Sequence, residues 1–254
     1  MTTSTTFVSA LLTNINGYRS IEKYVEYGKK LIALPINKVI FIERDVYNEH
    51  FSSSENTTFV FIEKSDLYLH KYADQITNFC PNTGTPEKDT LEYMFVQCNK
   101  TEWMRSAIEM NPYELKGPKD LLNNFVWIDF GIWHMIRDDQ VFTDTCMNIA
   151  KNPVDPEIRI ACGDPSYINW DDCCNSISWF FLGSIFGGDR DSLLKFADLV
   201  KNKCIQTIQE HGTIMWEINV WLLVYKDDPT LFRCYRASHD ASILRNWHSN
   251  PRKN

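Results

Sequence analysis

The sequence is poor in positive charge and has no long apolar run. It carries 26 Lys and Arg against 33 Asp and Glu, which gives a formal net charge of −7. A nucleic-acid-binding surface needs a basic patch, and the basic stretch Arg245 to Lys253 is short, so we exclude nucleic acid as a partner. A membrane span needs roughly 18 consecutive apolar residues, and no such run occurs, so no transmembrane segment is expected. The first residues also lack the features of a secretory signal, which predicts a cytoplasmic protein.

Signature motifs of several enzyme classes are missing. The sequence has no Gly-x-x-x-x-Gly-Lys phosphate loop, no Gly-x-Gly-x-x-Gly after its first predicted strand, no Gly-x-Ser-x-Gly elbow and no His-Glu-x-x-His. These absences argue against kinases, Rossmann dehydrogenases, serine hydrolases and zincins.

The eight cysteines do not form a metal-binding pattern. No Cys-x-x-Cys pair occurs, and the adjacent Cys173 and Cys174 cannot easily converge on one zinc ion. Four disulfides are one arrangement for eight cysteines. Several of them lie in apolar or helical patterns, however, where a reduced and buried thiol is ordinary, so we expect free thiols.

The N-terminal region alternates between strand and helix patterns. The apolar run from Phe7 to Leu12 predicts a strand, Ile21 to Ile32 a helix, Lys38 to Ile42 a buried strand, and Thr57 to Ile62 a third strand. A helical crossover favours parallel pairing, so we predict an α/β fold with a parallel sheet flanked by helices. Because 44% of the residues are hydrophobic, we expect residues 1–254 to form one domain.

The middle of the chain contains three further segments of regular pattern. The spacing of apolar residues predicts one long amphipathic helix from about Thr90 to Met110. Glu157 to Cys162 predicts a strand. The apolar run from Trp179 to Phe186 ends at Gly187 and Gly188.

Helix signals dominate the region that follows. Asp189 to Ser192 offers capping residues for a helix over residues 193–210, and Gly212 is placed to end that helix. Thr213 is predicted to cap another helix, which runs to about Tyr225.

An acidic residue follows the apolar strand pattern from Phe125 to Ile128. Asp129 comes directly after it, and Gly131 two residues later. Ligands of open α/β sheets lie at the carboxyl ends of the strands, and a carboxylate there can hold a divalent cation that bridges a diphosphate. Gly131 lets the backbone come close to a ligand, but it also removes a second acid. The alternative role of Asp129 is to cap the next turn.

The glycine pair and Glu217 each allow two interpretations. Gly187 and Gly188 either let a sugar or phosphate approach the backbone or form only a turn from strand to helix, and the residues alone favour the turn. Glu217 is placed about one turn inside an apolar helix, which predicts a part-buried acid. Such an acid is either a member of a structural ion pair or a perturbed acid suited to act as a general base.

Three histidines are candidate site residues. His134 follows Gly131 by three residues, while His239 and His248 lie in the C-terminal segment, which can fold back to supply a further metal ligand. The simpler interpretation of each is a surface or capping histidine.

These pieces, in their order along the chain, resemble the HtrL/YibB family, whose members resemble glycosyltransferases of the GT-A architecture. The resemblance covers most of the chain and rests above all on Phe125 to Ile132, which contains Trp-x-Asp-x-Gly, together with His134. Its weaker parts are Phe7-Val8-Ser9-Ala10, Tyr93 with Lys100 and Ala107 ahead of Asn111-Pro112, Ile185-Phe186-Gly187-Gly188, and the helix around Glu217.

The resemblance implies a GT-A-like, three-layer α/β/α sandwich with a mainly parallel central sheet and a nucleotide-sugar site. Thr13, Asn14 and Glu43 would lie on the nucleotide side, Asp129 on the diphosphate side, and the glycine pair beside the sugar and the acceptor. The donor-binding residues that the resemblance implies are Thr13, Asn14, Glu43, Lys100, Asp129, Gly131, Gly187 and Gly188.

The same resemblance suggests a divalent cation, Mn²⁺ or Mg²⁺, held by Asp129. His248 is the further ligand that the C-terminal segment would supply by folding back. GT-A enzymes normally use Asp-x-Asp, of which Asp129-Phe130-Gly131 keeps the first acid, so metal dependence is open. The helix acid of inverting members would fall on Glu217, which would deprotonate the acceptor hydroxyl, although Ile218 follows where the family pattern often has Gln.

Our first hypothesis is therefore a glycosyltransferase with Asp129 and Glu217 as catalytic residues. It would move a sugar from a UDP- or GDP-linked donor to a hydroxyl acceptor on a glycan or another molecule. The alternative is a protein of the same fold that binds a nucleotide sugar or carbohydrate without turnover. A third hypothesis is an interaction scaffold whose tryptophans form a partner surface.

Overall fold

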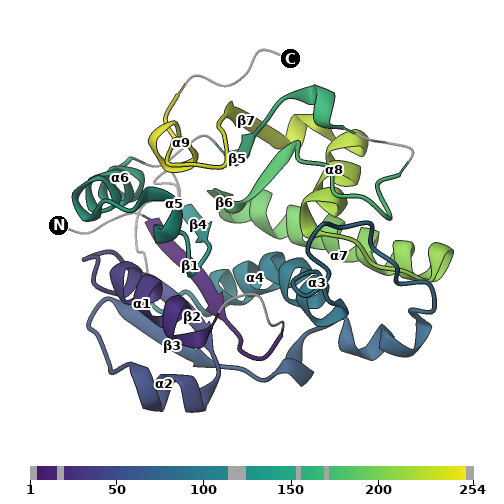
Figure 1. The fold of residues 1–254 in the computed structure, drawn as a ribbon. Coiled ribbons are helices and arrows are strands. Elements are labelled where there is room, and N and C mark those ends of the chain that lie inside the picture. The colour runs from purple at the N-terminus through teal and green to yellow at the C-terminus, as the bar shows by residue number, and fades with distance from the viewer. Residues whose placement is uncertain (1–4, 16–19, 114–123, 153–155, 169–171, 250–254) are drawn as a thin grey trace.

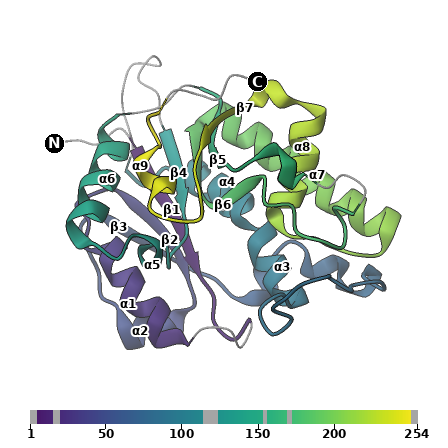
Figure 2. The ribbon, with the colours of Figure 1, turned by 45° about the horizontal axis from the view of Figure 1, so that its top comes forward.

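The computed structural model describes residues 5–15, 20–113, 124–152, 156–168 and 172–249. A seven-stranded sheet with the order β3-β2-β1-β4-β6-β5-β7 forms the centre of the molecule (Figures 1 and 2). β6 is antiparallel to both of its neighbours, and the other strand pairs are parallel. The strands are β1 (Thr5–Leu11), β2 (Lys38–Ile42), β3 (Thr57–Phe61), β4 (Asn124–Ile128), β5 (Ile158–Cys162), β6 (Phe181–Asp189) and β7 (Phe232–Arg236).

Alternate side chains of the strands face two separate apolar cores. Val8 and Trp127 face one core, whereas their neighbours Phe7 and Ile128 face the other. Figure 2 shows α1 and α6 on one side of the sheet and α4, α7 and α8 on the other. Helices on the first core are α3 (Leu91–Cys98), α4 (Lys100–Met110), α7 (Arg190–His211) and α8 (Glu217–Asp227). Those on the second are α1 (Ile21–Ile32), α2 (Arg44–His50), α5 (Trp133–Ile136), α6 (Asp139–Lys151) and α9 (Ser242–Arg245).

This architecture confirms the predicted fold class, a three-layer α/β/α sandwich with a mainly parallel central sheet. The parallel pairing predicted for the first three strands is also confirmed, with β1 parallel to β2 and β2 parallel to β3. The helix α2 between β2 and β3 was not predicted. All five residues of β2 are buried, which explains why residues 39–42 form an apolar run rather than an alternating pattern.

The helix predicted from Thr90 to Met110 is two helices. α3 ends at Cys98 and α4 begins at Lys100, with Asn99 between them at φ −82° and ψ −8°. Oδ1 of the Asn99 side chain accepts a hydrogen bond from the backbone N–H of Tyr68. Apolar residues continue on both sides of this break, which is why their spacing predicted one helix. The break makes Lys100 the first residue of a new helix.

The glycine pair does not form the predicted turn. Gly187 and Gly188 lie inside β6, where they pair with Val126 and Phe125. A Cβ atom on Gly187 would be 2.7 Å from the carbonyl oxygen of Phe125, so close strand packing explains the lack of a side chain there.

The helix signals after β6 are confirmed at α7 but were wrong at the start of α8. Asp189 caps α7 by accepting a hydrogen bond from the N–H of Ser192, and Gly212 ends that helix at φ 63°. Thr213 does not start α8, which begins at Glu217 after the N-cap Trp216. The apolar residues 214–216 pack into the core but are not helical. Their apolar character is why the predicted helix began too early in the sequence.

Two further expectations concern cysteines and membranes. All eight cysteines are free thiols, and six of them are buried, as expected of reduced structural cysteines. Within the described ranges, no helix combines the length and the apolar character needed to cross a bilayer.

Candidate functional site

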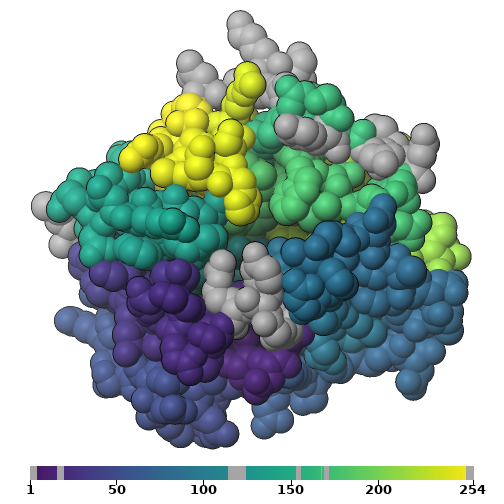
Figure 3. Space-filling view, in the orientation of Figure 1, coloured from purple at the N-terminus to yellow at the C-terminus, as the bar shows by residue number. Residues whose placement is uncertain are grey.

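A cavity of about 510 Å³ lies where β1 and β4 end and β6 begins. Segments distant in sequence meet around it, and Figure 3 shows the corresponding purple, blue, teal, green and yellow regions converging on one face. The polar and aromatic side chains that line the cavity are Tyr24, Lys88, Tyr93, Gln97, Lys100, Trp103, Trp127, Asp129, Phe130, His134, Arg137, Trp179, Ser184, Trp216, Glu217 and His239.

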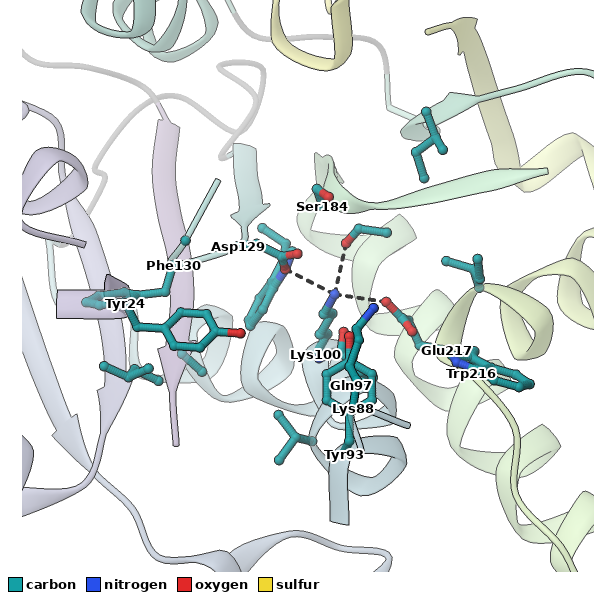
Figure 4. A pocket seen from close by; sticks show the side chains of 18 of the residues that line it. Tyr24, Lys88, Tyr93, Gln97, Lys100, Asp129, Phe130, Ser184, Trp216 and Glu217 are labelled. Carbon is teal, nitrogen blue, oxygen red and sulfur yellow. Dashed lines mark hydrogen bonds and ion pairs between the residues drawn. The ribbon is translucent and has the colours of Figure 1, made fainter. Parts of the chain in front are cut away.

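Lys100 connects the charged groups of this cavity. Its ammonium lies 3.0 Å from Oδ1 of Asp129 and 2.9 Å from Oε1 of Glu217, and it donates to the carbonyl oxygen of Gly183 at 3.0 Å (Figure 4). An ammonium has three N–H donors, so these three acceptors match its capacity. Only 3% of the Lys100 side chain is exposed, so its charge is buried. The three contacts of this charge link the end of β4, β6 and the start of α8.

Its two acidic partners stabilise the protonated form of Lys100. Burial alone would lower the pKa of this amine, but the carboxylates of Asp129 and Glu217 outweigh the burial, so the pKa is raised. Burial, together with the same two acids, holds the pKa of the nearby Tyr93 phenol well above its ordinary value. At neutral pH the centre of the cavity therefore contains an ammonium and a neutral phenol.

Asp129 is held in one orientation and still reaches the cavity. Its Oδ1 accepts hydrogen bonds from Trp127 Nε1 at 2.8 Å and from Lys100, and its backbone N–H donates to the carbonyl oxygen of Ser184. The side chain is 35% exposed and lines the cavity. It does not cap the following helix, since α5 has Ile132 as its N-cap residue with no side-chain cap. Asp129 does begin the turn that follows β4, because its backbone carbonyl oxygen accepts from the N–H of Ile132, whereas its side chain bonds to Trp127 and Lys100.

Glu217 is more deeply buried than Asp129. It is the first residue of α8, where the backbone N–H groups favour a negative charge, and its side chain is 8% exposed. Gly183 makes this approach possible, because a Cβ atom there would lie 2.4 Å from Oε1 of Glu217. Glu217 is thus a member of a buried ion pair, one of the two roles that its sequence context allowed.

The residues predicted on the nucleotide side form a separate cluster. Oε2 of Glu43, just after β2, accepts from both the N–H and the hydroxyl of Thr13, just after β1, at 2.6 Å each. Asn14 adopts a left-handed conformation with φ 53°, and its carbonyl oxygen accepts from Lys64 Nζ. This cluster lies at the carboxyl edge of the sheet, but its three predicted residues are not among those that line the cavity.

The other predicted residues divide into two groups. Gly131 and His134 line the cavity with Asp129, and a ring nitrogen of His134 contacts the carbonyl oxygen of Gly131. Gly187, Gly188 and His248 do not line it. Burial lowers the pKa of His248, which lies near Asn148 and Arg159 rather than near the acid predicted to share its metal ion.

Several cavity residues were missed by reasoning from the sequence. Lys88 precedes α3, Arg137 follows α5, and Trp179 precedes β6, so none of them ends a strand. Gly183 carried a signal, because a glycine in the interior of an apolar strand often marks a close approach of another group. Lys100 was predicted as a donor-binding residue, but its ion pairs with Asp129 and Glu217 were not predicted.

The acids of this cavity do not fit a divalent cation held by the protein. In the described part of the chain, no three His, Cys, Asp or Glu side chains are grouped so that they could hold a metal. Oδ1 of Asp129 already accepts two hydrogen bonds, one of them from an ammonium. Gly131 stands where a second acid of an Asp-x-Asp motif would be.

Comparisons with known proteins give only distant similarities. No family model and no curated protein matches the sequence. In structure, the chain is similar to 4-diphosphocytidyl-2C-methyl-D-erythritol synthase from Anaerococcus prevotii DSM 20548, with 8% identity, a TM-score of 0.37, and coverage of 92% of this chain and 86% of that one. It is also similar to Rv0371c from Mycobacterium tuberculosis H37Rv, with 9% identity, a TM-score of 0.39, and coverage of 97% and 98%. Membership of the HtrL/YibB family stays a prediction.

Proposed function

We propose that this protein is a glycosyltransferase that moves a sugar from a UDP- or GDP-linked donor to a hydroxyl acceptor. The observation that carries the proposal is the oriented Asp129 carboxylate, held by Trp127 and Lys100 at the carboxyl edge of the sheet, in a cavity with aromatic walls. Aromatic faces pack against sugar rings and bases, while a fixed carboxylate accepts hydrogen bonds from hydroxyl groups.

In the proposed reaction, the acceptor hydroxyl oxygen attacks the anomeric carbon of the donor sugar. The bond from that carbon to the diphosphate oxygen breaks, and the nucleoside diphosphate leaves with the bonding electrons. The hydroxyl proton passes to a carboxylate. We assign that carboxylate to Asp129 rather than to Glu217, because Asp129 is 35% exposed and Glu217 only 8%. Glu217 is then a positioning residue that acts through Lys100.

The test is a panel of UDP- and GDP-sugars in which release of the nucleoside diphosphate is measured with and without acceptor hydroxyl compounds. We expect turnover with at least one donor, and a fall of roughly 10²–10⁴ in kcat for Asp129→Asn with a nearly unchanged affinity for the donor. Absence of both turnover and binding across the panel would contradict the proposal.

The chain contains a matched control for this substitution. Asp139 also accepts hydrogen bonds from a tryptophan, Trp133, and from a lysine, Lys30, but it lies on the surface outside the cavity. Asp139→Asn removes the same charge from the same kind of partners. It should leave kcat within about twofold of the original value, since surface changes away from a site have small effects.

A second candidate function is binding of a nucleotide sugar or carbohydrate without turnover. It is favoured by the pairing of both acids with Lys100, which satisfies them without a substrate. The same panel separates the two, because a binding protein gives a heat of binding with donors but no release of nucleoside diphosphate at any enzyme concentration.

A further inference from the structure

The cavity carries more positive than negative side chains, although the chain as a whole is acidic. Lys88, Lys100 and Arg137 line it together with only two acids, Asp129 and Glu217, whereas the whole chain has a net charge of −7. A local excess of positive charge in an acidic protein indicates an anionic ligand, because a cleft focuses the field of its lining charges.

Lys100 supplies one of these charges but has no donor left for a ligand. Its ammonium is shared among Asp129, Glu217 and the carbonyl oxygen of Gly183, and its side chain is 3% exposed. A divalent cation placed on Asp129 would lie beside this ammonium and be repelled by it. Lys100 thus already provides the positive charge that a cation on Asp129 would supply.

Arg137 and Lys88 are the two basic side chains with greater access to a ligand. Arg137 is exposed and follows α5, and its Nε donates to the carbonyl oxygen of His134, which holds the guanidinium at the cavity wall. Lys88 lies before α3 with its ammonium 5.3 Å from the centre of the Tyr93 ring, and Figure 4 shows its side chain pointing into the cavity. A guanidinium forms two parallel bonds to a phosphate, and an ammonium acts as a point charge.

We propose that this cavity binds the diphosphate of its donor through Arg137 and Lys88, without a divalent cation on Asp129. The inference rests on the proposed function, since it names the groups that hold the nucleoside diphosphate. It leaves Asp129 for the sugar and the acceptor, and it replaces the predicted metal site by side chains of the chain itself.

Isothermal titration with UDP and with GDP, each in EDTA and in excess Mn²⁺, tests the inference. We expect the Kd of the better nucleotide to agree within about threefold between the two buffers. Arg137→Gln and Lys88→Gln should each weaken binding in EDTA by about tenfold or more, because each removes a charge-assisted contact. Lys151→Gln, at an exposed residue that ends α6 outside the cavity, should change Kd by less than about twofold.

Three results would overturn the inference, and they separate it from the proposed function. Binding that appears only with Mn²⁺, or that Mn²⁺ tightens by about tenfold or more, contradicts the metal-free site but leaves glycosyl transfer standing. Unchanged Kd values in both cavity variants, with thermal unfolding like that of the original protein, contradict the assignment of Arg137 and Lys88. No binding of either nucleotide in either buffer contradicts the proposed function and the inference together.

Discussion

The ammonium of Lys100 lies 2.9 Å from Oε1 of Glu217 and joins the first turn of α4 to the first residue of α8. Both groups are almost fully buried, at 3% and 8% side-chain exposure. A lysine at a helix N-terminus opposes the helix dipole, so its position depends on the two acids beside it. Burying one such charge alone is costly, whereas the pair with its hydrogen bonds is tolerated.

Removal of Lys100 should therefore destabilise the protein strongly. Lys100→Met leaves Glu217 buried without its counter-charge, and we expect a loss of about 3–5 kcal/mol in the free energy of unfolding, measured by urea denaturation at pH 7. The double variant Lys100→Met/Glu217→Gln removes the unpaired charge as well and should recover at least about 1 kcal/mol of that loss. A double variant less stable than the single one would show that the loss comes from packing rather than from charge.

Gly183 should not tolerate a side chain. A Cβ atom there would lie 2.4 Å from Oε1 of Glu217 and 3.0 Å from Ile218, so Gly183→Ala must displace α8 or the acid. We expect a loss of about 1–3 kcal/mol in the free energy of unfolding, together with weaker nucleotide binding. Gly84→Ala is the matched control, because no atom lies within 4 Å of a Cβ atom at that glycine. It should change stability by less than about 1 kcal/mol, and equal losses in the two variants would refute the steric explanation.

Trp179 should matter for sugar binding and little for stability. Its side chain is 43% exposed, it lines the cavity, and its ring lies 6.1 Å from that of His239 in an edge-on arrangement. Trp179→Ala should change the free energy of unfolding by less than about 1 kcal/mol. It should raise the Kd of a nucleotide sugar, measured by titration calorimetry, by about fivefold or more.

Met110 provides the comparison for Trp179. It is also 43% exposed but lies outside the cavity, so Met110→Ala should leave the same Kd unchanged within about twofold. If Trp179→Ala binds the nucleotide sugar as tightly as Met110→Ala does, the tryptophan is not part of the sugar site.

Lys38 should give the protein a distinct alkaline pH dependence. Its side chain is fully buried, its ammonium donates to the carbonyl oxygens of Leu34 and Ile36 at 2.6 Å each, and burial lowers its pKa from 10.5 to about 8. Between pH 8 and 10.5 the unfolded chain binds more protons at this lysine than the folded one, so its contribution to stability rises with pH. Below pH 8 the lysine is charged in both states, so its contribution no longer changes with pH and stays at its lowest value.

A comparison with Lys38→Met isolates this effect from other titrating groups. The free energy of unfolding of the original protein, minus that of the variant, should rise by up to about 3 kcal/mol from pH 8 to pH 10.5, as measured by urea denaturation at a series of pH values. The same substitution at exposed Lys29 controls for the loss of a lysine charge. A difference that stays constant over this interval would contradict the lowered pKa.

The strands and most helices could be predicted because their signals are local. Residues 39–42 of β2 form an apolar run. Asp189 caps α7, and Gly212 ends α7 in a left-handed conformation. The segment before Glu217 was wrongly predicted to be helical. Its apolar residues have the same spacing in the sequence whether they form a helix or pack as an extended chain. Hydrophobic periodicity alone does not distinguish these two outcomes.

The partners in the site could be predicted much less well. The position of Asp129 followed from the strand before it, but its ion pair with Lys100 depends on α4 and β4 facing each other. The contacts of Lys100 with Gly183 and Glu217 span 83 and 117 residues. No local pattern encodes such pairings, and the break at Asn99 that starts α4 was itself hidden by continuous apolar spacing.

The antiparallel strand β6 also has a consequence for synthesis of the protein. Because the antiparallel β6 begins at the carboxyl edge of the sheet, its first residues join a cavity wall that includes residues from Ala10 to His239. A nascent chain that has been made only as far as Asp129, just after β4, contains Lys100 and Asp129 but neither Gly183 nor Glu217. Two of the three N–H donors of the Lys100 ammonium then lack their acceptors until β6 and α8 have been made. The cavity can therefore assemble only after α8 has been made, and a ligand that binds it would stabilise only chains that include α8.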